Sequence, residues 1–476
     1  MDSQSVLRIF HEITKIPRES GHEEQMTAYL QQFAAKHGLA CKTDATGNVV
    51  ITKEAAPGKE HVPTLVLQGH QDMVCEKNAG CAHDFAKDPI PYVIEDGWMI
   101  AKDTTLGADD GIGVAACLAL LESDLPTGKL ECLFTISEET GMDGAMALEP
   151  GFFTGKTLIN LDSEDEGQLF VGCAGGVNTM VTFNYERENV KPGNEKMRLR
   201  IFGAQGGHSG DDINKERCNT VQQMARFLFK ELGGFQLILF AGGGKHNAIA
   251  RETEAVVAVP AEGKDAFVER FQAFGKALGA EFAVSDPGVV VEVKKFYPNE
   301  KALSDDVTRR LISSLVAVHH GVLAMSQDIK GLVETSSNLA SVRMNRPGKI
   351  DICTSQRSSV DSAKCFIADK VEACFRLAGA DVVRRSDPYP GWKPDMSSHI
   401  LKVSVDSYKR LFGVEPEVKA IHAGLECGLF LEKFPGLDMI SFGPTLRGVH
   451  APGEKLDLAS NEKFVRHLVD VVTHFE

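Results

Sequence analysis

Five side chains in this sequence have the chemistry and the placement of metal ligands. They are two imidazoles and three carboxylates: His70, Asp109, Glu139, Asp162 and His450. A donor set of nitrogen and oxygen without cysteine is expected of a catalytic rather than a structural zinc site. If one carboxylate bridges two ions, each ion receives three protein ligands and a shared position stays open for water. The set therefore predicts a two-metal hydrolase.

Each of these residues has an ordinary structural explanation when it is taken alone. An aspartate that opens a helix usually caps it, and the sequence contains 15 histidines. Their joint placement argues against coincidence. His70, Glu139 and Asp162 each come just after a short apolar run typical of a strand, and Asp109 opens the apolar helix between the first two runs.

Two further acids are expected to support the ligands. Asp72 follows His70 by two residues and can accept a hydrogen bond from the second ring N–H of that imidazole. Glu138 precedes Glu139 at an expected strand end, where successive side chains point to opposite sides. We therefore expect one glutamate to bind metal and the other, Glu138, to act as the general base toward water.

The elements that must position these side chains alternate between helix and strand. Strands are predicted over 64–69, 130–136 and 157–161, and a helix over 111–121. An earlier helix is expected to run to Gly38 behind a capping box formed by Ser20 and Glu23. This alternation predicts an α/β sheet, with its ligands beyond the carboxyl ends of the strands.

The chain is long enough for two domains. Along its 476 residues the pattern of predicted elements changes after Gly176, and 177–385 has strands and helices of its own. A proline-rich stretch at 388–394 marks the expected return of the chain to the first domain. We expect a catalytic domain formed by 1–176 and 386–476, and an inserted α+β domain at 177–385.

Bulk properties exclude several classes of protein. The net charge of -15 argues against nucleic acid or an anionic membrane as the main partner. No apolar run approaches the roughly 18 residues of a membrane span, and the first residues do not form a signal peptide. Eleven cysteines without a Cys-x-x-Cys pair indicate reduced thiols and a cytoplasmic location.

The metal ligands lie in motifs that resemble those of a known superfamily. The motifs are Gly69-His70-Gln71-Asp72, Gly107-Ala108-Asp109-Asp110-Gly111, Ser137-Glu138-Glu139-Thr140-Gly141, Asn160-Leu161-Asp162-Ser163 and Gly448-Val449-His450. In this order they resemble the co-catalytic zinc aminoacylase/carboxypeptidase superfamily. Over essentially the whole chain the sequence is most similar to its aminoacyl-histidine dipeptidase branch, which cleaves Xaa-His dipeptides including β-alanyl-histidine. Four other segments share that similarity: 206–210, 246–251, 336–340 and 422–428.

The resemblance implies a role for each residue of the metal set. Asp109 would bridge two zinc ions, which cobalt or manganese could replace. His70 and Asp162 would complete one site, and Glu139 and His450 the other. Glu138 would be the general base and Asp72 the partner of His70. The implied fold is a zinc-exopeptidase-like catalytic domain, with a mixed sheet flanked by helices.

The resemblance also implies a function for the inserted domain. It would be a lid through which the protein forms a homodimer. His208 would reach the neighbouring subunit's site and stabilise the tetrahedral oxyanion. Asn247 and Arg357 would hold the carboxyl end of a small peptide substrate, and Gly424 would contact it through its backbone.

Three other functions remain open on the residues alone. An aminoacylase or deacylase of N-acyl amino acids would use the same metal chemistry with a different pocket. A catalytically silent scaffold would be expected to lack Glu138 or a ligand, and none is missing. A two-metal phosphohydrolase would need basic residues beside the ligands, and the five metal segments contain none.

Overall fold

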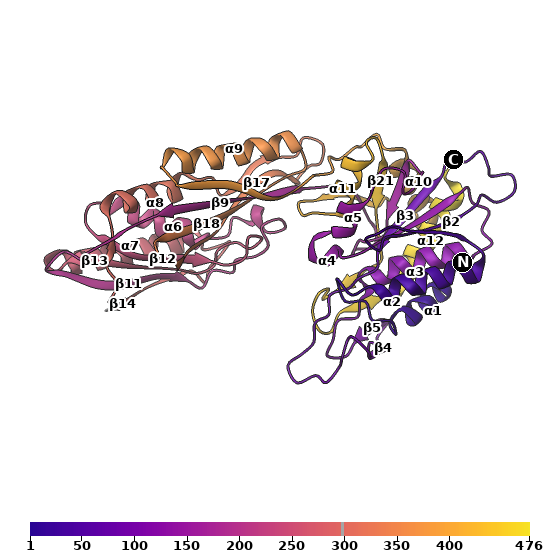
Figure 1. Cartoon of the computed structure of the whole chain (residues 1–476), viewed down its shortest axis with the longest axis horizontal. Helices are drawn as coiled ribbons and strands as arrows, with labels where there is room; N and C mark the ends of the chain where they lie inside the picture. The colour runs from indigo at the N-terminus through magenta and orange to yellow at the C-terminus, as the bar shows by residue number, and fades with distance from the viewer. Residues whose placement is uncertain (297–298) are drawn as a thin grey trace. The chain divides into compact units, whose positions relative to one another are not determined.

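The computed structural model describes residues 1–296 and 299–476, and it divides into two compact units. Unit 1 comprises Met1–Cys173, Trp392–Ala420 and Leu425–Glu476. Unit 2 comprises Ala174–Gly391 and the short segment Ile421–Gly424. The chain thus leaves unit 1 once for a long insertion and once more for four residues, and Figure 1 follows it by colour.

Unit 1 is built around a mixed sheet of eight strands in the order β1-β2-β6-β3-β7-β21-β8-β20 among the described residues. Its central strands β6, β3, β7 and β21 are parallel, and β1, β2 and β8 pair antiparallel at the flanks. The strands of this sheet are β1 (Ala40–Thr43), β2 (Val49–Lys53), β3 (Leu65–His70), β6 (Leu130–Thr135), β7 (Thr157–Asn160), β8 (Gln168–Cys173), β20 (Glu417–Ile421) and β21 (Asp438–Ser441). A smaller sheet contains β4 (Tyr92–Glu95), β5 (Trp98–Ala101), β22 (Leu446–Arg447) and β23 (Lys455–Asp457).

The helices of unit 1 cover this sheet. They are α1 (Ser3–Ile13), α2 (Glu24–His37), α3 (Ala108–Glu122), α4 (Glu138–Gly141), α5 (Asp143–Ala147), α10 (His399–Phe412), α11 (Glu426–Lys433) and α12 (Leu458–His474). From Ala108 to Leu121 every residue of α3 is buried, because its small and apolar side chains pack on β3 as well as on α1, which runs beside it in Figure 1. The prediction of an α/β fold with a mixed sheet flanked by helices is confirmed.

Unit 2 is an α+β unit with a long antiparallel sheet. Nine strands of the described chain form it, in the order β14-β11-β13-β12-β17-β18-β9-β19 with β16 paired to β17. Its strands are β9 (Gly175–Asn184), β11 (Asn194–Phe202), β12 (Gln236–Gly243), β13 (Thr253–Pro260), β14 (Val290–Lys295), β16 (Gly321–Met325), β17 (Val333–Arg346), β18 (Lys349–Ser358) and β19 (Val382–Tyr389). Beside it lie the short pair β10 (Arg187–Glu188) and β15 (Ala302–Leu303), and the 3-10 turns η1 (Ile213–Lys215) and η2 (Ala261–Gly263).

Four helices pack on the sheet of unit 2 and share one hydrophobic core with it. They are α6 (Thr220–Lys230), α7 (Lys264–Glu281), α8 (Asp305–Ala317) and α9 (Asp361–Leu377), and Figure 1 shows them along the sheet. Alternate residues of β11, namely Met197, Leu199 and Ile201, are buried in this core, as the two-residue period of a strand requires. One face of the sheet therefore packs against this hydrophobic core.

Two further features agree with the composition. No helix of the described residues is long and apolar enough to cross a membrane. All eleven cysteines lie in the described part of the chain and are free thiols there.

Candidate metal centre

Three neighbouring strands of unit 1 deliver polar residues to one edge of the sheet. β3 ends at His70, β6 ends just before Glu138 and Glu139, and β7 ends just before Asp162. These strands are parallel and adjacent in the order β6-β3-β7, so their carboxyl ends meet at the same edge. The strand positions predicted from the sequence therefore bring these side chains together.

A buried glutamate that the sequence analysis left without a role positions Asp109. The carboxylate of Glu454 accepts hydrogen bonds from the backbone N–H groups of Leu106, Gly107 and Ala108 at 2.7, 3.0 and 2.8 Å, and from Asp109 at 3.4 Å. Glu454 belongs to the same segment as His450. One loop therefore carries a candidate ligand and also holds the residues at the start of α3. The sequence signal for Glu454 is its position close behind the motif that contains His450, in the segment 448–454.

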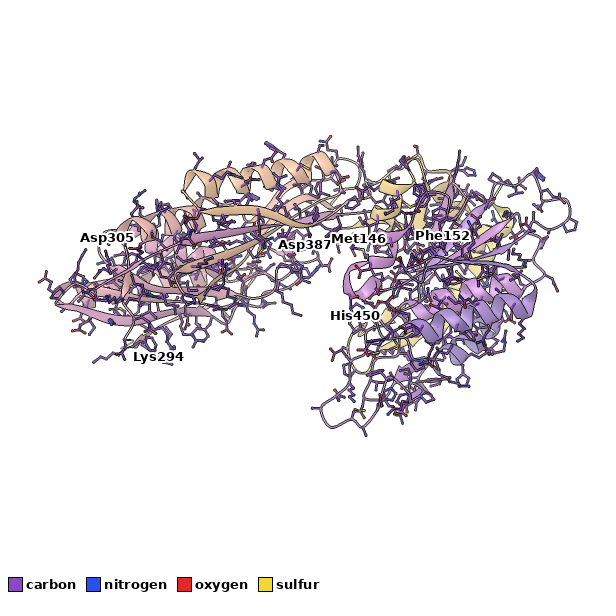
Figure 2. The ribbon with its side chains drawn as sticks, in the orientation of Figure 1. Met146, Phe152, Lys294, Asp305, Asp387 and His450 are labelled. Carbon is purple, nitrogen blue, oxygen red and sulfur yellow. The ribbon has the colours of Figure 1, made fainter. Side chains whose placement is uncertain are left out.

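The five predicted ligands converge around the Asp109 carboxylate. Oδ1 of Asp109 lies 3.0 Å from Nε2 of His70, and Oδ2 lies 3.2 Å from Nε2 of His450. His70 Nε2 is also 3.7 Å from Asp162 Oδ1. His450, labelled in Figure 2, lies 2.8 Å from Glu139 Oε1 through the same Nε2.

These contacts make two groups of three ligands that share Asp109. One group is His70, Asp109 and Asp162, the other is Asp109, Glu139 and His450, and the ligand atoms of each lie within 4.8 Å of one another. The donors are all nitrogen or oxygen, and carboxylates outnumber imidazoles, so the set suits two divalent cations.

The charges gathered around Asp109 shift the pKa values of the candidate ligands. Hydrogen bonds to Asp109 and Glu139 raise the pKa of His450 to about 11. Burial alone would lower the pKa of His70, but Asp162 and Asp109 outweigh it and hold that pKa well above its usual value. Burial and the charge of Asp109 raise the pKa of Asp162 to about 6. Burial also raises the pKa of Asp109, but its bonds to His450 and His70 override this and leave the pKa below its usual range.

Asp72 joins one ligand to the loop that carries the others. Its Oδ1 lies 3.3 Å from Nδ1 of His70, although the alignment falls short of a good hydrogen bond. The backbone N–H groups of Glu138 and Glu139 donate to Oδ1 and Oδ2 of Asp72 at 3.1 and 3.2 Å. Asp72 therefore lies beside His70 without the expected hydrogen bond to its ring, and it holds the glutamate pair through the main chain.

The local structure of the glutamate pair differs from the expectation. Glu138 and Glu139 are not at an extended strand end, because Ser137 has a left-handed backbone (φ 51°) and the pair begins the short helix α4. Burial raises the pKa of Glu138 well above its usual value, Asp162 and Glu426 add to this effect, and His70 opposes it. The two residues share a helical turn, and a carboxylate oxygen of each lies within 4.8 Å of the other and of a ring nitrogen of His70.

The capping box predicted at Ser20 and Glu23 is wrong. α2 begins at Glu24 without a side-chain cap. Ser20 Oγ donates instead to Asp72 Oδ2 at 2.8 Å, and Glu23 Oε1 accepts from the backbone N–H and the hydroxyl of Ser137 at 2.9 and 3.0 Å. Tertiary partners beside the metal centre therefore take the groups that would have capped the helix.

Two buried ionisable residues near the ligands, Arg18 and Asp110, were not identified from the sequence. Arg18, 2% exposed, donates to the carbonyls of Gln71, Asp72 and Gly107 and so ties the His70 segment to the Asp109 segment. Asp110 accepts from the His70 N–H at 3.3 Å, and burial raises its pKa well above the usual value. Nothing in the local sequence distinguishes Arg18 from a surface arginine.

The other predicted site residues lie together in unit 2. Arg357 is 6% exposed, and it donates through Nε to Ser209 Oγ at 3.3 Å and through its NH1 nitrogen to the Tyr389 hydroxyl at 3.0 Å. The Ser209 N–H donates to the Asn247 carbonyl at 2.8 Å. A Cβ at Gly424 would lie 3.0 Å from the Tyr389 ring, so a larger residue there would press on that ring. Among the described residues, Arg357 forms no ion pair.

His208 adjoins this cluster and faces a cavity. Its Nδ1 lies 3.2 Å from Asp211 Oδ2 and 3.3 Å from the Gly210 N–H, which leaves Nε2 for a ligand. A cavity of about 610 Å³ is lined by His208, Asn247 and Arg251 among others. A larger hollow of about 700 Å³ between α1 and α12 is lined by none of the predicted site residues.

Two of the other shared segments support the cluster. Asn338 Nδ2 donates to the carbonyls of His246 and Ala248 at 3.1 and 2.9 Å, on either side of Asn247. Ser336 Oγ lies 2.8 Å from Nε2 of His422, whose pKa burial and Arg357 lower to about 3. The segments 336–340 and 246–251 and His422 therefore lie together near Arg357.

Comparison with known proteins agrees with this geometry. The family model of Peptidase family M20/M25/M40 matches residues 66–474. The cytosol non-specific dipeptidase of Escherichia coli (strain K12) is 38% identical over 463 residues, which are 97% of this chain and 95% of that protein. The crystal structure of aminoacylhistidine dipeptidase from Vibrio alginolyticus is 39% identical, with a TM-score of 0.92 and coverage of 99% of this chain and 96% of that one.

A more distant structure shares the fold alone. The aminopeptidase PepT from Bacillus cereus ATCC 10987 is 16% identical with a TM-score of 0.62, and the match covers 99% of this chain and 98% of that one. The resemblance inferred from the motifs and the predicted metallopeptidase class are both confirmed. This chain belongs to Peptidase family M20/M25/M40.

Proposed function

We propose that the protein hydrolyses the peptide bond of dipeptides with two zinc ions and a glutamate base. The observation that carries this proposal is the pair of ligand triads sharing Asp109. His70 and Asp162 would hold one ion, Glu139 and His450 the other, and Asp109 both. Bound there, the ions would polarise the scissile carbonyl and lower the pKa of water.

Glu138 is the general base in this proposal. It adjoins the ligand Glu139, and the main chain of both residues is held by Asp72. One of its carboxylate oxygens takes a proton from the attacking water and later gives it to the leaving amine. Burial supports this role because it raises the pKa of Glu138 toward the working range of a base.

The cluster around Arg357 holds the substrate in this proposal. A dipeptide brings a free carboxylate, and a buried carboxylate must be paired. Arg357 is buried, lacks an acidic partner among the described residues, and can offer a carboxylate two parallel N–H groups. Asn247 and the backbone of Gly424 complete the carboxylate contacts, and Nε2 of His208 donates to the oxyanion.

Xaa-His dipeptides, including β-Ala-His, are the preferred substrates in this proposal. The names of the two relatives differ on this point, since one is a non-specific and the other an aminoacylhistidine dipeptidase. A panel of Xaa-His dipeptides, other dipeptides and N-acyl amino acids tests it. Faster turnover of N-acyl amino acids than of any dipeptide would make the protein a deacylase instead.

Assembly and location are part of the proposal. We propose a cytoplasmic homodimer formed through unit 2, in which His208 serves the neighbouring subunit's metal centre. The free thiols of all eleven cysteines and the name of the Escherichia coli relative support the cytoplasm. The hydrogen bond from Arg357 to Ser209, the neighbour of His208, supports a role for both residues at one metal centre.

Metal binding to the metal-free protein is expected to release protons. At pH 7 His450 carries a proton, because its pKa of about 11 lies above that pH, and the neighbouring acids shift the pKa of His70 in the same direction. Metal binding should therefore displace at least about one proton, that of His450, and the affinity should rise with pH. Titration calorimetry in two buffers of different ionisation enthalpy measures this, and His450→Ala should remove one proton from the count. Proton-neutral binding would contradict this assignment of the ligands.

Substitution of the two adjacent glutamates should separate chemistry from metal binding. Glu138→Ala should keep both metals and lower turnover by at least about 10²-fold, the usual scale for loss of a general base. Glu139→Ala is the matched control and should lose metal, while the bonds from both backbone N–H groups to Asp72 stay intact. Metal analysis beside steady-state kinetics measures both. The opposite pattern would reverse the two roles.

Mixing inactive variants should reveal which residues share a site. His208→Ala mixed with Glu138→Ala under conditions of subunit exchange should recover part of the activity, because one hybrid site has both residues intact. His208→Ala mixed with Arg357→Ala should recover nothing, since one chain's cluster contains both. Recovery in the second mixture would separate His208 from Arg357, and none in the first, with heterodimers present, would place His208 in its own chain's site.

Carboxylate anchoring should make Arg357 and the substrate's C-terminus interdependent. Arg357→Lys keeps the charge but not the paired contacts, so kcat/KM should fall by about 10-fold or more, or about 1.5–3 kcal/mol. Amidation of the dipeptide should harm the wild type severely and Arg357→Ala much less. Arg343→Lys, whose guanidinium bonds the Gly243 carbonyl in the same unit, is the control and should respond to amidation like the wild type. Equal cleavage of free and amidated dipeptides by the wild type would rule out this anchor.

A further inference from the structure

A buried row of polar side chains connects the strands that bear the proposed ligands. Gln68 and Asn160 lie two residues before His70 and Asp162, and Gln68 points to the same face of β3 as His70. Asn160 Nδ2 donates to Gln68 Oε1 at 2.6 Å, and its Oδ1 accepts from the backbone N–H of Asp162 at 3.3 Å. The amide pair therefore couples β3 to β7 directly before both ligands.

Glu426 completes the row from a distant part of the sequence. This first residue of α11 is 1% exposed, and its Oε2 accepts from Gln68 Nε2 at 2.7 Å and from Thr135 Oγ1 at 2.9 Å. Thr135 is the last residue of β6, three positions before Glu138. One carboxylate oxygen thus binds β6 and β3 together, and through Gln68 and Asn160 it also reaches β7.

The opposite end of the row reaches the segment after β7. Ser441, at the end of β21, donates to Asn160 Oδ1, and its hydroxyl lies 2.7 Å from that of Ser163. The row therefore crosses four adjacent strands in the order β6-β3-β7-β21. None of the proposed metal ligands belongs to this row of side chains. Three of the five ligands, His70, Glu139 and Asp162, nevertheless follow a member of the row closely in sequence.

We propose that Glu426 is a positioning residue of the metal centre. Resting on the function proposed above, this inference assigns it the task of holding the ends of β6, β3 and β7 at the spacing that His70, Asp162 and the Glu138–Glu139 pair require. The reason is geometric: a ligand sphere tolerates errors of only a few tenths of an ångström, and one acceptor bonded to side chains of both strands restrains how the ends of β6 and β3, paired at Thr135 and His70, can shift.

The chain offers a matched control for a buried carboxylate. Glu131 lies on β6, four residues before Thr135, and is 4% exposed. Its oxygens accept from the Thr154 N–H and hydroxyl at 2.7 and 2.8 Å and from the Gly155 N–H at 3.0 Å. Glu131 therefore resembles Glu426 in burial and bonding, but its partners carry no proposed ligand.

Metal affinity of the full-length metal-free protein tests the proposal, with Mn²⁺ as the probe in titration calorimetry. Glu426→Ala should weaken Mn²⁺ binding by about 10–100-fold, the usual effect of losing a group that orients ligands. Glu426→Gln should restore most of the affinity, because its amide oxygen can accept the same two bonds. Glu131→Ala should lower the thermal unfolding temperature of the metal-free protein but leave the affinity within about twofold of the wild type.

The outcomes separate this inference from the function on which it rests. A wild-type protein without Mn²⁺ binding would overturn the proposed metal centre itself. Normal affinity in Glu426→Ala, equal losses in Glu426→Ala and Glu131→Ala, or no rescue by Glu426→Gln would overturn the positioning role alone. Should Glu426→Ala fail to fold, Thr135→Val removes one of the two donors with little change of shape. It should then lower the affinity, and an unchanged affinity would count against the proposal.

Discussion

The Asp109 carboxylate lies between two imidazoles, and most of unit 1 can be understood as the scaffold that this contact requires. Each oxygen faces one histidine, and one of those histidines is 341 residues away along the chain. Two more carboxylates, Glu139 and Asp162, complete the surrounding triads. Carboxylates this close repel one another unless cations or protons lie between them, so the centre must be held by the fold rather than by its own ligands.

The scaffold meets this requirement largely with backbone groups. Glu454 is held by N–H groups before α3, Asp72 by those of Glu138 and Glu139, and Arg18 by three carbonyl oxygens. Backbone amides stabilise a buried carboxylate without neutralising it. The negative charge of the ligands is therefore left for divalent ions, while the loops that carry them are fixed.

Unit 1 gathers negative charges around Asp109, whereas unit 2 buries the positive charge of Arg357. Arg357 is buried and forms no ion pair among the described residues, its hydrogen-bond partners Ser209 and Tyr389 are neutral, and the nearby Asp211 feels its charge. A buried guanidinium is costly unless an anion joins it. This is the observation behind the proposal that the cluster takes a carboxylate.

The sequence by itself determined the α/β fold and predicted the candidate ligands that gather at the sheet edge, because both depend on local patterns. Apolar runs with a two-residue period predict strands, and the polar residues that end them must gather at one edge of a parallel sheet. Asp109 at the start of an apolar helix belongs to the same pattern. His450 has no such periodic context, and it was recognised through its motif.

Only the tertiary structure decided which polar residues support the ligands. Ser20 and Glu23 have the local signature of a helix cap, yet their partners are Asp72 and Ser137. Glu138 and Glu139 begin a turn of helix after a left-handed Ser137, and no strand pattern predicts this. Glu426 meets Gln68 across 358 residues of chain. A hydrogen bond between such distant residues leaves no periodic trace in the sequence, because only folding brings its two groups together.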